Sequence, residues 1–173
     1  MTLRLRLIQA SMGAALTVLS QAAGANLTIE ITQGAEGAQP IAIVPFSWNG
    51  PGQPVEDVAA IVAADLKRSG QFAPMPSANF VSMPHEADQV HFHDWRLLGA
   101  PDLVIGSVSD EGGRYLVKFR LFDVFKGSQL SAFSFHPTTA EVRHVGHKIS
   151  DMVYESITGE PGAFDTRIAY VRE

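Results

Sequence analysis

The chain of 173 residues contains no cysteine, which excludes disulfide bonds, thiol catalysis and a lipid anchor attached through cysteine. Charged side chains make up only 18% of the sequence, and the 18 acidic residues outnumber the 13 basic ones. This balance opposes nonspecific attraction to nucleic acid and to anionic lipid. Hydrophobic residues reach 46%, which is typical of a globular chain, and the length allows one domain with short appendages.

The sequence also lacks the common motifs of catalysis. It has no Gly-x-Ser-x-Gly elbow, no P-loop ending in Gly-Lys-Ser/Thr and no His-Glu-x-x-His. His144 and His147 are three residues apart and could share a helical face, whereas His91 and His93 are two apart and point to different sides. No motif supplies further ligands, so we expect no metal site, no cofactor and no enzymatic activity.

No apolar run approaches the roughly 20 residues that cross a bilayer. The first 25 residues nevertheless have the organisation of a secretory signal. Arg4 and Arg6 are followed by an apolar stretch over residues 12–19 and by the small residues Ala23-Gly24-Ala25. We predict a signal peptide over residues 1–25 and a soluble periplasmic product, whose net charge without the two arginines is about −7.

After the predicted cleavage site, residues 27–32 alternate apolar and polar side chains, as a strand with one buried face does. Residues 33–39 contain Gly34 and Gly37 and nothing to build a core, so we predict a flexible segment over residues 26–39. Two interpretations remain open. The strand adds to the sheet edge of a partner, or it completes the sheet of its own domain.

Residues 40–160 show the alternating signals of a single α+β domain. Helix 55–68 carries Asp57 and Asp65 eight residues apart, on similar sides, and we expect both to lie on a solvated face. Strand 115–125 is predicted to carry Val117, Phe119, Leu121 and Phe125 on one side. The predicted fold is α+β, with two main helices and a short helix packed on a mixed sheet of about five strands. The predicted elements are a strand at 40–46, helices at 55–68 and 86–98, strands at 103–108, 115–125 and 130–135, and a helix at 142–157 with a capping box at Thr138 and Glu141.

A new β-prone run begins after the last helix, at residues 164–171. A strand that starts there needs partners. Either it pairs back onto the sheet of this domain, or it opens a further part of a longer chain.

Several stretches resemble the amino-terminal domain family of TolB, the periplasmic component of the Tol-Pal cell-envelope system, over essentially the whole mature chain. The stretches that carry the resemblance are Pro40-Ile41-Ala42-Ile43-Val44-Pro45-Phe46 with Trp48 and Gly50-Pro51-Gly52, then Ile61-Val62-Ala63-Ala64-Asp65-Leu66 with Ser69-Gly70, His144-Val145-Gly146-His147 with Ser150-Asp151, and Gly162-Ala163-Phe164 with Thr166-Arg167-Ile168-Ala169-Tyr170-Val171.

The resemblance implies a domain of two principal helices on a five-stranded mixed sheet, like the anticodon-binding domains of tRNA synthetases, followed in the family by a six-bladed β-propeller. It also implies that the mature amino terminus docks on the carboxy-terminal domain of TolA, supporting outer-membrane integrity and invagination during cell division. Pal binds the propeller, so the resemblance does not extend Pal binding to this chain. The implied partner-binding residues are Leu27, Thr28, Ile29, Glu30, Ile31, Thr32 and Gln33.

Residues 161–173 would then be the linker and first strand of a propeller that this sequence does not contain. The implied linker residues are Phe164, Thr166, Arg167, Ile168 and Tyr170. An alternative interpretation is a periplasmic α/β domain that binds a small ligand or nucleic acid, which the secretion signal and the acidity oppose.

Overall fold

The computed structural model describes residues 37–166. Their strands form one mixed sheet in the order β3-β1-β4-β5-β6, with β2 pairing separately with β4. β1 runs parallel to β3 and β4, while β4, β5 and β6 form an antiparallel meander. The strands are β1 (Gln39–Ile43), β2 (Ser47–Asn49), β3 (Phe72–Pro74), β4 (Asp102–Asp110), β5 (Tyr115–Asp123) and β6 (Ser128–Phe135).

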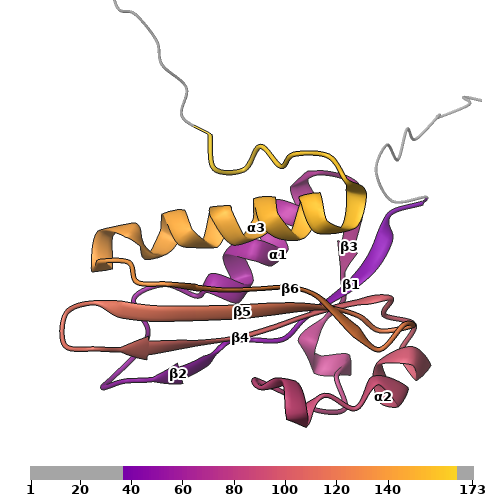
Figure 1. Cartoon of the computed structure of the whole chain (residues 1–173), viewed down its shortest axis with the longest axis horizontal. Coiled ribbons are helices and arrows are strands. Elements are labelled where there is room, and N and C mark those ends of the chain that lie inside the picture. Colours follow the sequence, from indigo (N-terminus) through magenta and orange to yellow (C-terminus); the bar gives the residue numbers. More distant parts are fainter. Residues whose placement is uncertain (1–36, 167–173) are drawn as a thin grey trace, which may run out of the picture. The chain divides into compact units, whose positions relative to one another are not determined.

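The helices lie on both faces of this sheet, which confirms the predicted α+β fold (Figure 1). α1 (Val58–Arg68) and α3 (Val142–Thr158) cover one face, and α2 (Phe92–Leu97) lies on the other. Each face has its own apolar core. The α1/α3 core includes Ile41, Val62, Leu66, Phe119, Leu121, Val145 and Ile149, and the α2 core includes Val44, Trp95, Leu103, Ile105, Phe122 and Val124.

Local signals fix the ends of the two long helices. The Asp57 side chain accepts a hydrogen bond from the amide of Ala60 at 3.0 Å, so α1 begins after Asp57 rather than at the predicted residue 55. Before α3, the backbone amide of Thr138 donates to the Glu141 carboxylate at 2.9 Å, confirming the capping box. Gly159 ends α3 with φ of 77°, a conformation that glycine adopts at little cost.

The two long helices approach each other closely at Gly146. A Cβ atom at this position would lie 2.9 Å from Cγ2 of Ile61, so the packing of α3 on α1 requires a residue without a side chain. This contact brings the first half of α3 against the first half of α1.

Some predicted elements differ from the structure. The strand predicted at 40–46 ends at Ile43, because Pro45 has no amide to donate, and the next strand, β2, lies beyond the predicted range and pairs further along β4. The prediction missed β3 altogether. Helix 86–98 is also divided, into a 3-10 turn (Ala87–Gln89) and α2. Here the Gln89 side chain accepts from the amides of His85 and Glu86 and caps the start of the 3-10 turn.

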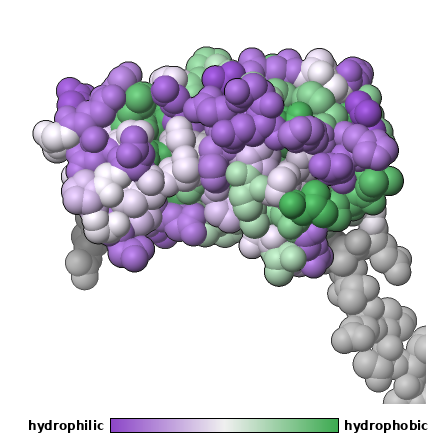
Figure 2. Space-filling model, turned by 90° about the horizontal axis from the view of Figure 1, so that it is seen from below, coloured by the Kyte–Doolittle hydropathy of each residue, from purple (hydrophilic) through white to green (hydrophobic). Residues whose placement is uncertain are grey.

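The prediction that the strand continues to Phe125 is wrong, because β5 ends at Asp123 and a turn follows. Phe125 is 61% exposed and adjoins α2, where the Nε atom of Arg96 donates to the carbonyl of Val124 at 3.0 Å. Leu97 of α2 is also exposed. On the α2 side the surface is mostly hydrophilic, and its largest hydrophobic area lies toward the end of the molecule where α2 sits (Figure 2).

Candidate functional site

The predicted site residues fall into two groups. Phe164 and Thr166 lie within the described residues, in the segment that follows α3. The other predicted residues lie outside the described part of the chain: Leu27, Thr28, Ile29, Glu30, Ile31, Thr32, Gln33, Arg167, Ile168 and Tyr170.

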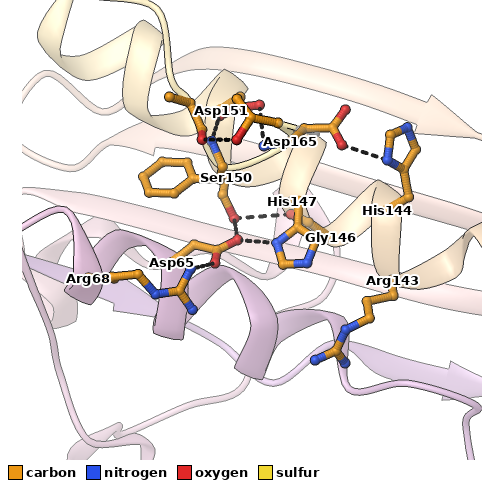
Figure 3. A network of polar contacts seen from close by, with 12 residues as sticks. Asp65, Arg68, Arg143, His144, Gly146, His147, Ser150, Asp151 and Asp165 are labelled. Atoms are coloured by element: carbon orange, nitrogen blue, oxygen red, sulfur yellow. Dashed lines mark hydrogen bonds and ion pairs between the residues drawn. The ribbon is translucent and has the colours of Figure 1, made fainter. Parts of the chain in front are cut away.

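The segment after α3 folds back and is held on that helix. The carboxylate of Asp151 accepts hydrogen bonds from the amides of Phe164 at 2.7 Å and Asp165 at 3.1 Å (Figure 3). The Asp165 carboxylate in turn meets Nδ1 of His144 at 2.5 Å. Gly162 permits this approach, because a Cβ there would lie 2.4 Å from the Asp151 carboxylate. We call residues 161–166 the exit segment.

An aromatic chain ties the exit segment to the core. The ring of Phe164 packs edge-on against Tyr154 of α3 at 5.8 Å between centroids, and Tyr154 packs edge-on against the buried Phe72 of β3 at 5.9 Å. A cleft of about 430 Å³ opens beside these rings, where Arg68 and Thr166 also contribute to its wall. The first predicted linker residues are therefore fixed to the domain.

A second polar cluster joins α1 to α3 around Asp65. Its carboxylate accepts from Ser150 Oγ at 3.0 Å, lies 2.6 Å from Nδ1 of His147, and pairs with Arg68 at 3.1 Å (Figure 3). The expectation that Asp65 is solvated is wrong, because the side chain is 1% exposed. Its position on the face of Val62 and Leu66 was a sequence signal for burial.

The two histidines of the predicted pair meet different carboxylates. His147 contacts Asp65 of α1, and His144 contacts Asp165 of the exit segment. Within residues 37–166, no group of three or more His, Asp or Glu side chains is arranged to hold a metal ion. His91 and His93 are both exposed on the other side of the sheet.

Serine, histidine and aspartate thus lie together, but not in the order that nucleophilic catalysis uses. Ser150 Oγ is fully buried and bonds to Asp65 and to the carbonyl of Gly146 at 3.0 Å, and not to His147. A nucleophilic serine needs an accessible hydroxyl with a histidine base in contact with it. The cluster therefore joins the two helices and does not present Ser150 as a nucleophile.

The structure also bears on membrane insertion. In the described part of the chain, no helix combines the length and the apolar character that crossing a membrane requires.

Comparison with known proteins establishes the family. The family model of the TolB amino-terminal domain matches residues 27–130, more than half of the chain. The chain belongs to this family. The Tol-Pal system protein TolB of Nitrosococcus oceani is 50% identical to the chain over 155 residues, and that of Thioalkalivibrio sulfidiphilus is 46% identical over 156 residues. Alignments of this length extend beyond residue 130.

These two TolB relatives align with 89% of this chain, but the chain spans only 36% of their length. The crystal structure of TolB from Acinetobacter baumannii is similar in fold, with a TM-score of 0.66 and 33% identity. That match covers 79% of this chain and 32% of the other. The names of the family and of these relatives describe a component of the Tol-Pal system and mention no catalytic activity.

Proposed function

We propose that this chain is a non-catalytic, periplasmic interaction module of the Tol-Pal system. Its mature amino-terminal segment, residues 27–33, binds the carboxy-terminal domain of TolA, and this contact supports outer-membrane integrity and invagination at cell division. The observation that carries the proposal is the start of the family match at residue 27. Cleavage after Ala25 would place the first residues of the family domain at the mature amino terminus.

The described sheet begins a few residues after this segment. β1 first pairs at Gln39, opposite Phe72 of β3, and β4 joins only at Ile41. Gly37, with φ of 116°, precedes this strand. The described part of the sheet has six strands. An alternating segment such as residues 27–33 can add a strand to the sheet edge of a partner.

Deletion of residues 26–33 from the mature chain tests the proposal. We expect binding to the TolA carboxy-terminal domain to disappear in calorimetric titration, while the thermal transition of the domain stays largely unchanged. Undiminished binding by the shortened chain would exclude the segment as the binding site.

We further propose that residues 40–160 form the domain and that residues 161–173 lead toward a β-propeller, whose Pal binding lies outside this chain. The exit segment supports a linker, because Asp151 and His144 fix its start on α3. Sequencing of the genomic DNA beyond codon 173 tests this. We expect propeller repeats of about 40 residues, and an authentic stop codon would contradict the boundary.

A further inference from the structure

α2 covers only one end of its face of the sheet (Figure 1). The apolar core on this side takes Leu103 and Ile105 from β4 and Phe122 from β5. Further along the same strands and on the same face, Ser107 of β4 is partly exposed and Lys118 of β5 is exposed. No helix of the described residues covers the half of this face that carries β2.

A row of polar side chains crosses this uncovered half. The row consists of residues that are opposite one another in the register, namely Ser47 of β2, Ser107 of β4, Lys118 of β5 and Ser134 of β6. Side chains opposite one another lie on the same face of a sheet, and Val117, the neighbour of Lys118 along β5, lies in the α1/α3 core. The row therefore points away from α1 and α3.

Strand β5 adds a column of basic side chains to this row. Arg114, Lys118 and Arg120 are separated by even numbers of residues. The bridge between Arg114 and Thr138 continues the register of β5 with β6, so the three basic side chains leave the sheet on the same face. We call the following six side chains the open face: Ser47, Ser107, Arg114, Lys118, Arg120 and Ser134.

The open face is basic, although the chain as a whole is acidic. Arg120 meets Glu86 at 3.4 Å, but the two side chains are 36% and 51% exposed, so this pair is weak. At the hairpin end, Glu111 pairs with His136 at 3.6 Å. The other two basic side chains of the open face make no ion pair with residues 37–166. The open face therefore carries an excess of positive charge and attracts an anionic ligand.

The side chains of the open face distinguish between kinds of anionic ligand. None of the large hydrophobic side chains that are exposed among residues 37–166 belongs to it, and it contains no aromatic ring. A membrane requires apolar side chains that insert between lipids, a protein partner an apolar or aromatic anchor, and a single-stranded nucleic acid rings on which its bases stack. Serine hydroxyls and basic side chains instead match the hydroxyl and carboxylate groups of an acidic sugar.

We propose that the open face binds an acidic polysaccharide. Arg114 and Lys118 hold its carboxylates, and Ser107 and Ser134 form hydrogen bonds with its sugar hydroxyl groups. Because Arg114 and Lys118 are four residues apart along one strand, a separation of about 13 Å, the ligand is a chain of sugars rather than a single sugar. This site goes beyond the contact with TolA and uses no residue of the amino-terminal segment.

Nuclear magnetic resonance titration of the mature chain with decagalacturonate, which carries one carboxylate on each sugar, tests this site. We expect saturable shifts of the amides around the row in β4, β5 and β6, and weaker binding as the salt concentration rises. The neutral chain maltodecaose should cause no saturable shift. The absence of saturable shifts with decagalacturonate, or equal binding of the neutral chain, would overturn the proposal.

Matched variants test the charge of the open face. Lys118→Gln should weaken decagalacturonate binding roughly fivefold, because it removes one exposed ion pair with a carboxylate. The control Lys67→Gln removes the same charge from an exposed position on α1, on the other side of the sheet, and should leave binding unchanged. Equal affinities of these two variants for decagalacturonate would refute the site.

Other occupants of the open face are distinguished by three measurements. Deletion of residues 26–33 should leave decagalacturonate binding unchanged, so this site and the TolA contact are tested separately; loss of binding would assign the site to that segment and overturn the proposal. Deca-glutamate that binds as tightly as decagalacturonate would assign the open face to an acidic peptide. Binding of phosphatidylglycerol vesicles that Lys118→Gln weakens would assign it to a membrane, and either result would also overturn the proposal.

Discussion

Replacing Asp65 by alanine should destabilise the domain strongly, because this buried carboxylate joins α1 to α3. The variant leaves His147, Ser150 and Arg68 without their common partner. The three lost interactions contribute differently to the free energy of unfolding, and the contribution of each depends on how exposed its donor is.

Arg68 is 69% exposed, so its pair with Asp65 contributes at most about 1 kcal/mol. His147 is 27% exposed and can turn toward water, which limits its loss to about 1 kcal/mol. Ser150 is fully buried but keeps the Gly146 carbonyl at 3.0 Å, so it loses one charge-assisted bond of about 1.5 kcal/mol. The sum for Asp65→Ala is about 3 kcal/mol, which corresponds to a fall of about 12 °C in Tm for a domain of this size.

Urea denaturation at pH 7, followed by circular dichroism, measures this change, and the m-value should stay constant. Asp65→Asn should cost less than Asp65→Ala, since the amide oxygen can still accept from Ser150. The control Asp88→Ala removes an exposed acid and should change stability by less than about 0.5 kcal/mol. A loss below about 1 kcal/mol for Asp65→Ala would refute the assignment of Asp65 as the principal polar link between the helices.

Three further perturbations test the packing and electrostatics. Gly146→Ala should lower the free energy of unfolding by about 1 kcal/mol, because the clash with Ile61 exceeds the gain in helix propensity. In a double-mutant cycle, Ile61→Val should reduce this loss, and additive losses of the two variants would contradict the clash. Asp102→Asn should stabilise the chain at pH 7, because burial raises the pKa of Asp102 and its ionisation opposes folding as pH rises. In urea titrations this gain should vanish as the pH falls toward 3.8, and a gain that does not depend on pH would contradict the cause. Asp165→Asn should speed hydrogen exchange of the Phe164 amide with little change in Tm, because the partner His144 is half exposed; unchanged exchange would show that this pair does not hold the exit segment.

The long elements were predictable because their apolar periods extend over many residues. α3 carries its buried side chains at helical spacing from Val142 to Val153, and β5 alternates from Tyr115 to Leu121. β2 and β3 contain three residues each, too few to show a period, and β3 ends in Pro74. Their pairing depends on strands more than 30 residues away, which no local pattern reports.

The polar links of the site were less predictable than the core. Asp65 has its partners His147 and Ser150 more than 80 residues further along the chain. The only local signal for the burial of Asp65 was its place among apolar residues on one face of α1. The prediction of a solvated face did not take this signal into account. The spacing of His144 and His147 predicted that the two side chains could share a face of the helix. It could not predict their carboxylate partners, which come from the exit segment and from α1.

The central claim is that one face of the mature amino-terminal segment binds TolA, and matched variants of adjacent residues test it most directly. Ile29→Asp places a charge on the apolar side of the alternating segment, whereas Thr28→Asp places the same charge on the polar side. In calorimetric titration against the TolA carboxy-terminal domain, we predict that Ile29→Asp abolishes binding and Thr28→Asp retains it. Equal affinities for the two variants would contradict the account.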